Sequence, residues 1–189
     1  WADQIIVAKN LTRRNINSQM RHMLFGVDNE VPVEGDKIIC LRNAWETVTE
    51  AGDVLVNGTI GTINNIKYNR NHPFLKPQMT ADFISDDYTD FDIQVSPFDV
   101  SFRDLNIDYK LLTTGEPTVT EKNFRRFPKQ FRPLTFDYGY CITCHKAQGS
   151  EYDKVLVLEE YLRGNDHDRW LYTAATRAKE RLVIVRNFK

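Results

Sequence analysis

The order of apolar and polar residues predicts a strand followed by a helix at the start of the chain. Residues 4–8 read QIIVA, a short apolar run of the kind that forms a buried strand. In the segment that follows, four apolar residues recur at positions i, i+4, i+7 and i+8, which is one face of a helix: Ile16, Met20, Met23 and Leu24. Gly26 stands where that helix should end. A strand followed by a helix predicts the first unit of an α/β domain.

The next part of the chain predicts strands without helices. Residues 35–43 (GDKIICLRN) read as a strand. Residues 54–68 (VLVNGTIGTINNIKY) read as a hairpin that turns at Asn57 and Gly58, a pair strongly favoured in two-residue turns.

From residue 64 to residue 133 the pattern changes. Short β-rich runs alternate there with proline, aspartate and asparagine, and no helical periodicity is found. We therefore expect a small β-domain at residues 64–133, inserted into an α/β domain formed by residues 1–63 and 134–189.

The α/β pattern resumes after the insert. It predicts strands at residues 140–143, 154–158 and 181–185, a helical turn near residues 145–150, and a helix at residues 168–180. The apolar face of that last helix consists of small residues and one leucine: Leu171, Ala174, Ala175 and Ala178.

Composition and charge exclude some classes of protein. The chain has 189 residues, 41% hydrophobic and 27% charged, as in an ordinary globular protein. It has no apolar run long enough for a membrane span and no recognisable secretory signal, so we expect a cytoplasmic protein without a membrane partner. The net charge of -1 gives no overall attraction to a polyanion.

The charge is unevenly distributed along the chain. Residues 82–108 contain eight aspartates and one arginine, and their spacing is not that of a calcium loop, which favours a solvated surface. Residues 123–136 interleave four phenylalanines with four basic residues, among them Arg125 and Arg126. Such a segment can stack bases and follow phosphates, or it can be core phenylalanines with solvated charges.

The segment Cys141-Ile142-Thr143-Cys144-His145 matches the C-x-x-C-H pattern of haem attachment. A c-type haem needs export, which nothing in the sequence signals, and a zinc site needs a second pair of ligands, whereas Cys40 stands alone. The segment also lacks the long helix that follows a thioredoxin-like C-x-x-C. We expect no haem and no metal here, and free, semi-buried thiols in a reducing compartment.

Four segments resemble superfamily 1 helicases. Residues 141–158 (CITCHKAQGSEYDKVLVL) resemble motif V, and residues 171–185 (LYTAATRAKERLVIV) resemble motif VI, in the order found in those proteins. Residues 5–17 are similar to the strand and helix near motif IV. The GDKIICLRN and VLVNGTIGTI segments resemble the RecD/Dda-like branch of the superfamily.

The resemblance implies the second RecA-like domain of an ATP-dependent DNA helicase, with an SH3-like β-domain as the insert. The chain has no G-x-x-x-x-G-K-[ST] sequence and no glycine followed by lysine, so it lacks a P-loop. The P-loop and the acidic residue for Mg²⁺ are therefore expected on an upstream RecA-like domain of the same polypeptide, and the isolated chain is expected to be inactive. Translocation along single-stranded DNA in the 5′ to 3′ direction is implied by analogy.

Residue roles follow from the same resemblance. Arg177 is implied as the arginine finger against the γ-phosphate of ATP, whereas its spacing alone favours a surface arginine paired with a glutamate. The implied nucleotide side contains Gln148, Gly149 and Glu151, and the implied DNA side contains Thr143 and His145. Lys146 is assigned to the nucleotide side, although it is compatible with either. Arg13 and Arg14 lie on the polar face of the first helix, facing either DNA or solvent. A non-catalytic nucleic-acid-binding or regulatory module, or an RNA-directed relative, stays an alternative.

Overall fold

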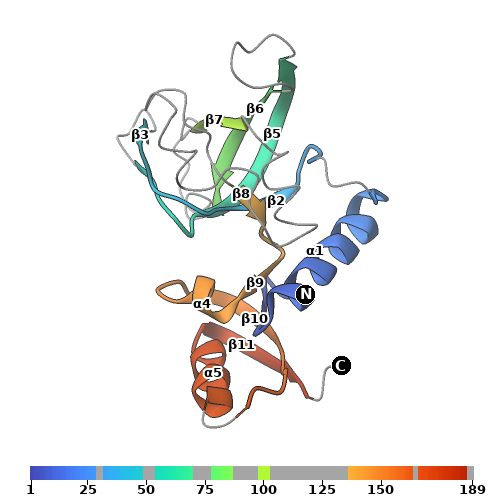
Figure 1. Cartoon of the computed structure of the whole chain (residues 1–189), viewed down its shortest axis with the longest axis vertical. Coiled ribbons are helices and arrows are strands. Elements are labelled where there is room, and N and C mark those ends of the chain that lie inside the picture. Colours follow the sequence, from blue (N-terminus) through green and yellow to red (C-terminus); the bar gives the residue numbers. More distant parts are fainter. Residues whose placement is uncertain are drawn as a thin grey trace. The chain divides into compact units, whose positions relative to one another are not determined.

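The computed structural model describes residues 1–28, 32–48, 54–69, 78–86, 98–102, 136–163 and 166–186. They divide into two compact units, which are described separately (Figure 1). Unit 1 consists of Trp1–Asp28 and Tyr140–Lys189, and unit 2 consists of Asn29–Gly139.

Unit 1 is built on a four-stranded parallel sheet. Its strands lie in the order β11 (Ala178–Val185), β10 (Tyr152–Leu158), β1 (Gln4–Val7) and β9 (Cys141–Thr143). The predicted strands at both ends of the chain are therefore confirmed. β1 is paired on both sides, and its Ile6 lies opposite Val157 on β10 and Ile142 on β9. Several of the apolar side chains of these strands are completely buried: Ile6, Val7, Val155 and Val157.

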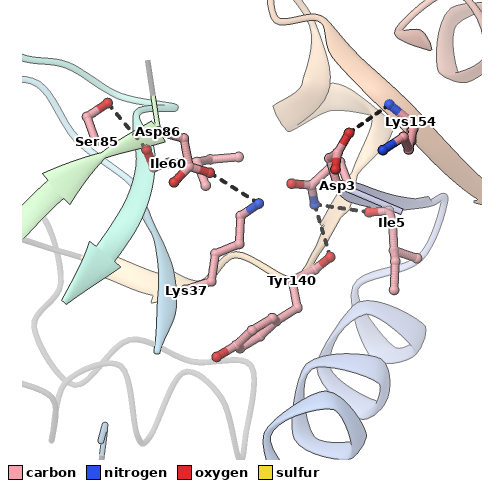
Figure 2. A network of polar contacts seen from close by, with 9 residues as sticks. Asp3, Ile5, Lys37, Ile60, Ser85, Asp86, Tyr140 and Lys154 are labelled. Carbon is pink, nitrogen blue, oxygen red and sulfur yellow. Dashed lines mark hydrogen bonds and ion pairs between the residues drawn. The ribbon is translucent and has the colours of Figure 1, made fainter. Parts of the chain in front are cut away.

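Hydrogen bonds of Asp3 and Gln4 also connect the beginning of β1 to the neighbouring segments. The side-chain amide of the buried Gln4 donates to the carbonyl oxygens of Tyr140 (3.1 Å) and Ile5 (3.2 Å). Asp3 exchanges hydrogen bonds with the backbone of Lys154, through its own N–H and its carboxylate, both at 2.9 Å. Figure 2 shows these contacts at the start of the strand.

Helix α1 (Asn10–Phe25) follows β1, as predicted, and lies on one side of the sheet, with α4 and α5 on the other (Figure 1). It ends at Gly26, which has a φ of 68° and donates its N–H to the carbonyl of His22. No helix of the described residues is long and apolar enough to cross a membrane.

The predicted apolar face of α1 is only partly right. Ile16 packs against the core cluster of Val7, Cys141 and Leu158. Met23 and Leu24, however, are 76% and 56% exposed, whereas Asn17 and Arg21 are buried at 3% each. Asn17 is buried because its side chain forms hydrogen bonds with the sheet. The spacing of apolar residues contains no information on such a polar contact.

The side chain of Asn17 pairs with the free backbone edge of β9. Its Nδ2 donates to the carbonyl of Cys141 at 3.1 Å, and its Oδ1 accepts the N–H of Cys141 at 2.7 Å. β9 is an edge strand among the described residues, so these two backbone groups have no partner strand. The amide therefore replaces a neighbouring strand for this residue and ties α1 to the sheet.

The last helix is shorter than predicted. α4 (Cys144–Ala147) is a single turn, and α5 covers Asp166–Ala175 with Trp170 and Ala174 buried. Ala178 already belongs to β11 and pairs with Tyr152, so it is not part of the helical face. Arg177 consequently lies in the turn between α5 and β11, where its carbonyl accepts the N–H of Tyr152.

Unit 2 is built on a five-stranded antiparallel sheet. The strands lie in the order β7 (Phe98–Phe102), β6 (Gln78–Ser85), β5 (Ile60–Asn69), β2 (Lys37–Cys40) and β8 (Phe136–Tyr138), and β3 (Ala44–Val48) and β4 (Val54–Leu55) form a separate pair. Phe83 and Phe136, both buried, contact each other with ring centroids 5.5 Å apart. Lys37 forms an ion pair with Asp86 at 3.2 Å (Figure 2).

The insert differs in extent from the predicted residues 64–133. It includes β2 and β8, because β2 pairs with β5 on one side and with β8 on the other. An apolar run such as KIIC is compatible with either sheet, and only its partners place it in unit 2. The likeness of the insert to an SH3 domain stays a prediction.

The predicted hairpin is wrong, although its turn is present. The carbonyl of Val56 accepts the N–H of Thr59 across Asn57 and Gly58. The strands that flank this turn do not pair with each other: β4 pairs with β3, and β5 pairs with β2 and β6.

The three cysteines are core residues. Cys141, Cys144 and Cys40 are free thiols with exposed fractions of 0%, 3% and 1%. Burial raises the pKa of Cys141 above its ordinary value, against the opposing charge of Arg13. Among the described residues, no three His, Cys, Asp or Glu side chains gather in a way that could hold a metal.

Replacing Asn17 with alanine should destabilise unit 1, because the N–H and carbonyl of Cys141 lose their partner while still buried. We expect a loss of about 2 to 4 kcal/mol in the free energy of unfolding by urea. Asn15→Ala, on the exposed side of α1, is the matched control. Equal midpoints for the two variants, with no faster hydrogen exchange at the Cys141 amide, would contradict this role.

The thiols of Cys141 and Cys144 should react slowly in the folded protein, since burial disfavours their thiolate forms. With an aromatic disulfide reagent at pH 8, we expect labelling more than about tenfold slower than in the urea-unfolded chain. Peptide mass spectrometry identifies the labelled cysteine. Rapid labelling of either residue under native conditions would show that the thiol is accessible.

Candidate nucleotide and nucleic-acid interface

The parallel sheet of unit 1 separates the candidate residues into two groups. All four strands run in the same direction, so residues that follow the strands gather at one edge of the sheet and residues that precede them gather at the other. Lys9, His145 and Glu160 follow β1, β9 and β10 at the C-terminal edge. Ser150 and Arg177 precede β10 and β11 at the N-terminal edge.

The motif V segment connects the two edges. Thr143 ends β9 and is only 7% exposed, and the next residues form the single turn α4. His145 is exposed, and Lys146 is half-buried. Gln148 and Glu151 are exposed at the other end of the segment, with Gly149 between them in a left-handed conformation (φ 86°) that favours glycine.

Arg177 is held by three oxygen atoms of its own unit. Its Nε donates to the carbonyl of Thr173 at 3.1 Å, its Nη1 to the carbonyl of Ser150 at 3.2 Å, and its Nη2 to the hydroxyl of Thr176 at 3.1 Å. The contact with Ser150 joins the motif V and motif VI segments. Within the described part of the chain, Arg177 forms no ion pair with a carboxylate, so the salt-bridge alternative finds no support there.

The same arginine influences a buried thiol. Burial raises the pKa of Cys144, and the positive charge of Arg177 opposes that rise. The thiol of Cys144 also donates to the carbonyl of Trp170 on α5 at 3.7 Å. Motif V therefore contacts the middle of α5, through Cys144 and Trp170, and the turn that follows α5, through Ser150 and Arg177.

Glu160 is a site residue that the sequence analysis missed. It is 3% exposed, and its Oε2 accepts the N–H groups of Ala8 and Lys9, both at 2.8 Å. Its Oε1 accepts the hydroxyl of Thr12 at 2.5 Å and lies 3.8 Å from the ammonium of Lys9. A carboxylate at this position satisfies free N–H groups at the beginning of α1 and interacts favourably with the helix dipole.

Glu160 thereby fixes the start of the helix that carries Arg13 and Arg14. Both arginines are half-buried, and the Nε of Arg13 donates to the side chain of Asn10 at 3.2 Å. The sequence offered one signal for Glu160, a pair of glutamates directly after a buried strand. Arg125 and Arg126 lie outside the described residues.

One family model matches the chain. Residues 138–185, which include both the motif V and the motif VI segments, match the UvrD-like helicase C-terminal domain. No curated protein sequence matches the chain.

Solved structures of Pif1 helicases have the same fold. A Pif1 helicase from Candida albicans is 16% identical with a TM-score of 0.56, over 100% of this chain and 45% of that structure. Bacteroides Pif1 bound to single-stranded DNA is 14% identical with a TM-score of 0.51, over 98% of this chain and 41% of that structure. The chain spans less than half the length of these proteins, and at such identities the likeness concerns the fold. Residues 138–185 therefore match a UvrD-like helicase C-terminal domain, and the chain as a whole has the fold of these Pif1 helicases.

Proposed function

We propose that this chain is the C-terminal part of an ATP-dependent DNA helicase, and that it supplies the arginine finger and part of the single-stranded DNA track. The observation that carries the proposal is the contact between Arg177 and Ser150, which brings motifs V and VI together at one edge of the sheet. The beginning of motif V lies at the opposite edge. Such a domain has one edge for a nucleotide and the other for a nucleic acid.

At the nucleotide edge, Arg177 contacts the γ-phosphate of an ATP molecule bound by an upstream RecA-like domain. In the described part of this structure Arg177 donates only to neutral oxygens. A negatively charged phosphate oxygen accepts a stronger hydrogen bond from the guanidinium, so replacing a neutral acceptor by the phosphate is favourable. Lys146, Gln148, Gly149 and Glu151 line this side. The described residues offer no cluster of ligands for Mg²⁺, which in this proposal is held by the upstream domain.

At the nucleic-acid edge, the exposed His145 is the more accessible contact for phosphates, because Thr143 is buried. The structure of Bacteroides Pif1 bound to single-stranded DNA supports this class of ligand. Translocation from 5′ to 3′ is part of the proposal by analogy at the level of the fold. A cytoplasmic location is also part of it and agrees with three free thiols.

Arg177→Ala should abolish turnover without abolishing binding. In the polypeptide that contains the upstream domain, we expect the kcat of DNA-stimulated ATP hydrolysis to fall by roughly 10³-fold or more, because the finger stabilises charge in the transition state. Binding of single-stranded DNA should be unchanged, and the exposed Arg181→Ala on β11 should behave like the wild type.

Unchanged ATPase activity of the Arg177→Ala variant would exclude the finger role. The chain of residues 1–189 by itself should show no measurable ATP hydrolysis, and robust turnover by it would contradict a nucleotide site divided between two domains. If the whole polypeptide binds DNA but lacks ATP coupling in its wild-type form, the non-catalytic alternative replaces the helicase.

A further inference from the structure

Three aromatic rings contact one another in sequence, in the segment that follows β10 and in helix α5. The ring of Tyr161 lies against that of His167, with centroids 6.1 Å apart and an angle of 33° between the planes. The ring of His167 lies against that of Trp170, at 6.2 Å and 35°. We call these three residues the aromatic row. Its inner end, Trp170, is 7% exposed, whereas its outer end, Tyr161, is 77% exposed.

The aromatic row is fixed from several directions. The Nε2 atom of His167 lies 3.2 Å from the carboxylate of Glu159. Trp170 belongs to the buried face of α5, and its carbonyl accepts the thiol of Cys144 in motif V. Tyr161 is thus a large exposed ring that packs on side chains with partners of their own, so its ring is held in place before a flat ligand stacks on it.

The position of Tyr161 continues the nucleic-acid edge. Tyr161 lies three residues after the end of β10, and His145 lies two residues after the end of β9. β10 and β9 are separated by β1 alone, so their ends are about 10 Å apart at the usual strand spacing of roughly 4.8 Å. A segment of a few nucleotides covers that distance. Lys9, whose side chain is 55% exposed, lies between them after β1.

The charges near the aromatic row do not repel a nucleic acid. Glu159 is engaged by His167 and lies 3.9 Å from Arg186, and Glu160 is buried against the start of α1. Along the described residues from Tyr161 to Trp170, the exposed charged residues are two acidic and two basic: Asp166, Asp168, Arg163 and Arg169. Recognition here therefore depends on the ring and not on attraction to phosphates.

We propose that Tyr161 is a stacking platform for an unpaired base of single-stranded DNA, at the end of the track that begins at His145. This inference rests on the proposed function and adds a contact to it. An aromatic residue that stacks a base contributes about 1 to 3 kcal/mol, with little preference for the base. Tyr172 is the natural comparison, since it is also exposed (73%) but contacts no other ring among the described residues.

The test compares Tyr161→Ala, Tyr161→Phe and Tyr172→Ala in the whole polypeptide, with a fluorescein-labelled oligo(dT) and anisotropy at several salt concentrations. For Tyr161→Ala we expect affinity to fall about 5- to 150-fold, which corresponds to the stacking contribution. The slope of log K against log salt should stay that of the wild type, because no phosphate contact is lost. Tyr161→Phe and Tyr172→Ala should bind as the wild type does.

Each outcome separates this inference from the proposed function. If the wild type binds oligo(dT) and Tyr161→Ala binds equally well, the platform is overturned and the helicase proposal stands. Loss of affinity in Tyr161→Phe as large as in Tyr161→Ala would also overturn it, since phenylalanine keeps the ring. If the wild type fails to bind single-stranded DNA, the proposed function falls and the platform with it. Equal urea midpoints for all variants exclude a loss of affinity by unfolding.

Discussion

The pairing of β1 with β9 on one side and β10 on the other is the constraint on which the structure of unit 1 depends. It joins residues 4–7 to residues 141–158, which are separated from them by all of unit 2. The entropy cost of closing such a loop grows only logarithmically, by about 0.6 kcal/mol for each doubling of its length. A long insert is therefore tolerated, because β1, β9 and β10 bury apolar side chains such as Ile6, Cys141 and Val157.

The same parallel arrangement determines what the unit can do. Because the strands run in the same direction, the residues that precede them lie at one edge of the sheet and the residues that follow them lie at the other. The two edges can therefore bind different ligands. The acidic side chains at the C-terminal edge, Glu159 and Glu160, are engaged within the unit. At the N-terminal edge Arg177 donates only to neutral oxygens, so its charge has no acidic partner among the described residues.

The elements whose signals are local could be predicted from the sequence, and those that depend on distant partners could not. β1, α1 and its end at Gly26, and the strand of motif V each follow from a few adjacent residues. The placement of β2 in the antiparallel sheet depends on β5 and β8, and an apolar run contains no information on which sheet it joins. Asn17 and Glu160 were missed for a related reason, since each satisfies backbone groups of a distant segment.

Motif V and α5 together span the unit from edge to edge. α5 has ten residues, so it extends about 15 Å at a rise of roughly 1.5 Å per residue. Motif V contacts the middle of this helix through the thiol of Cys144, and it contacts Arg177, in the turn after the helix, through the carbonyl of Ser150. Under the proposed function, a contact of Arg177 with the γ-phosphate therefore acts on the same packed body that presents His145 and Tyr161 to DNA. Closure of this body onto a nucleotide would move the DNA contacts with it, and no internal rearrangement of the domain is required.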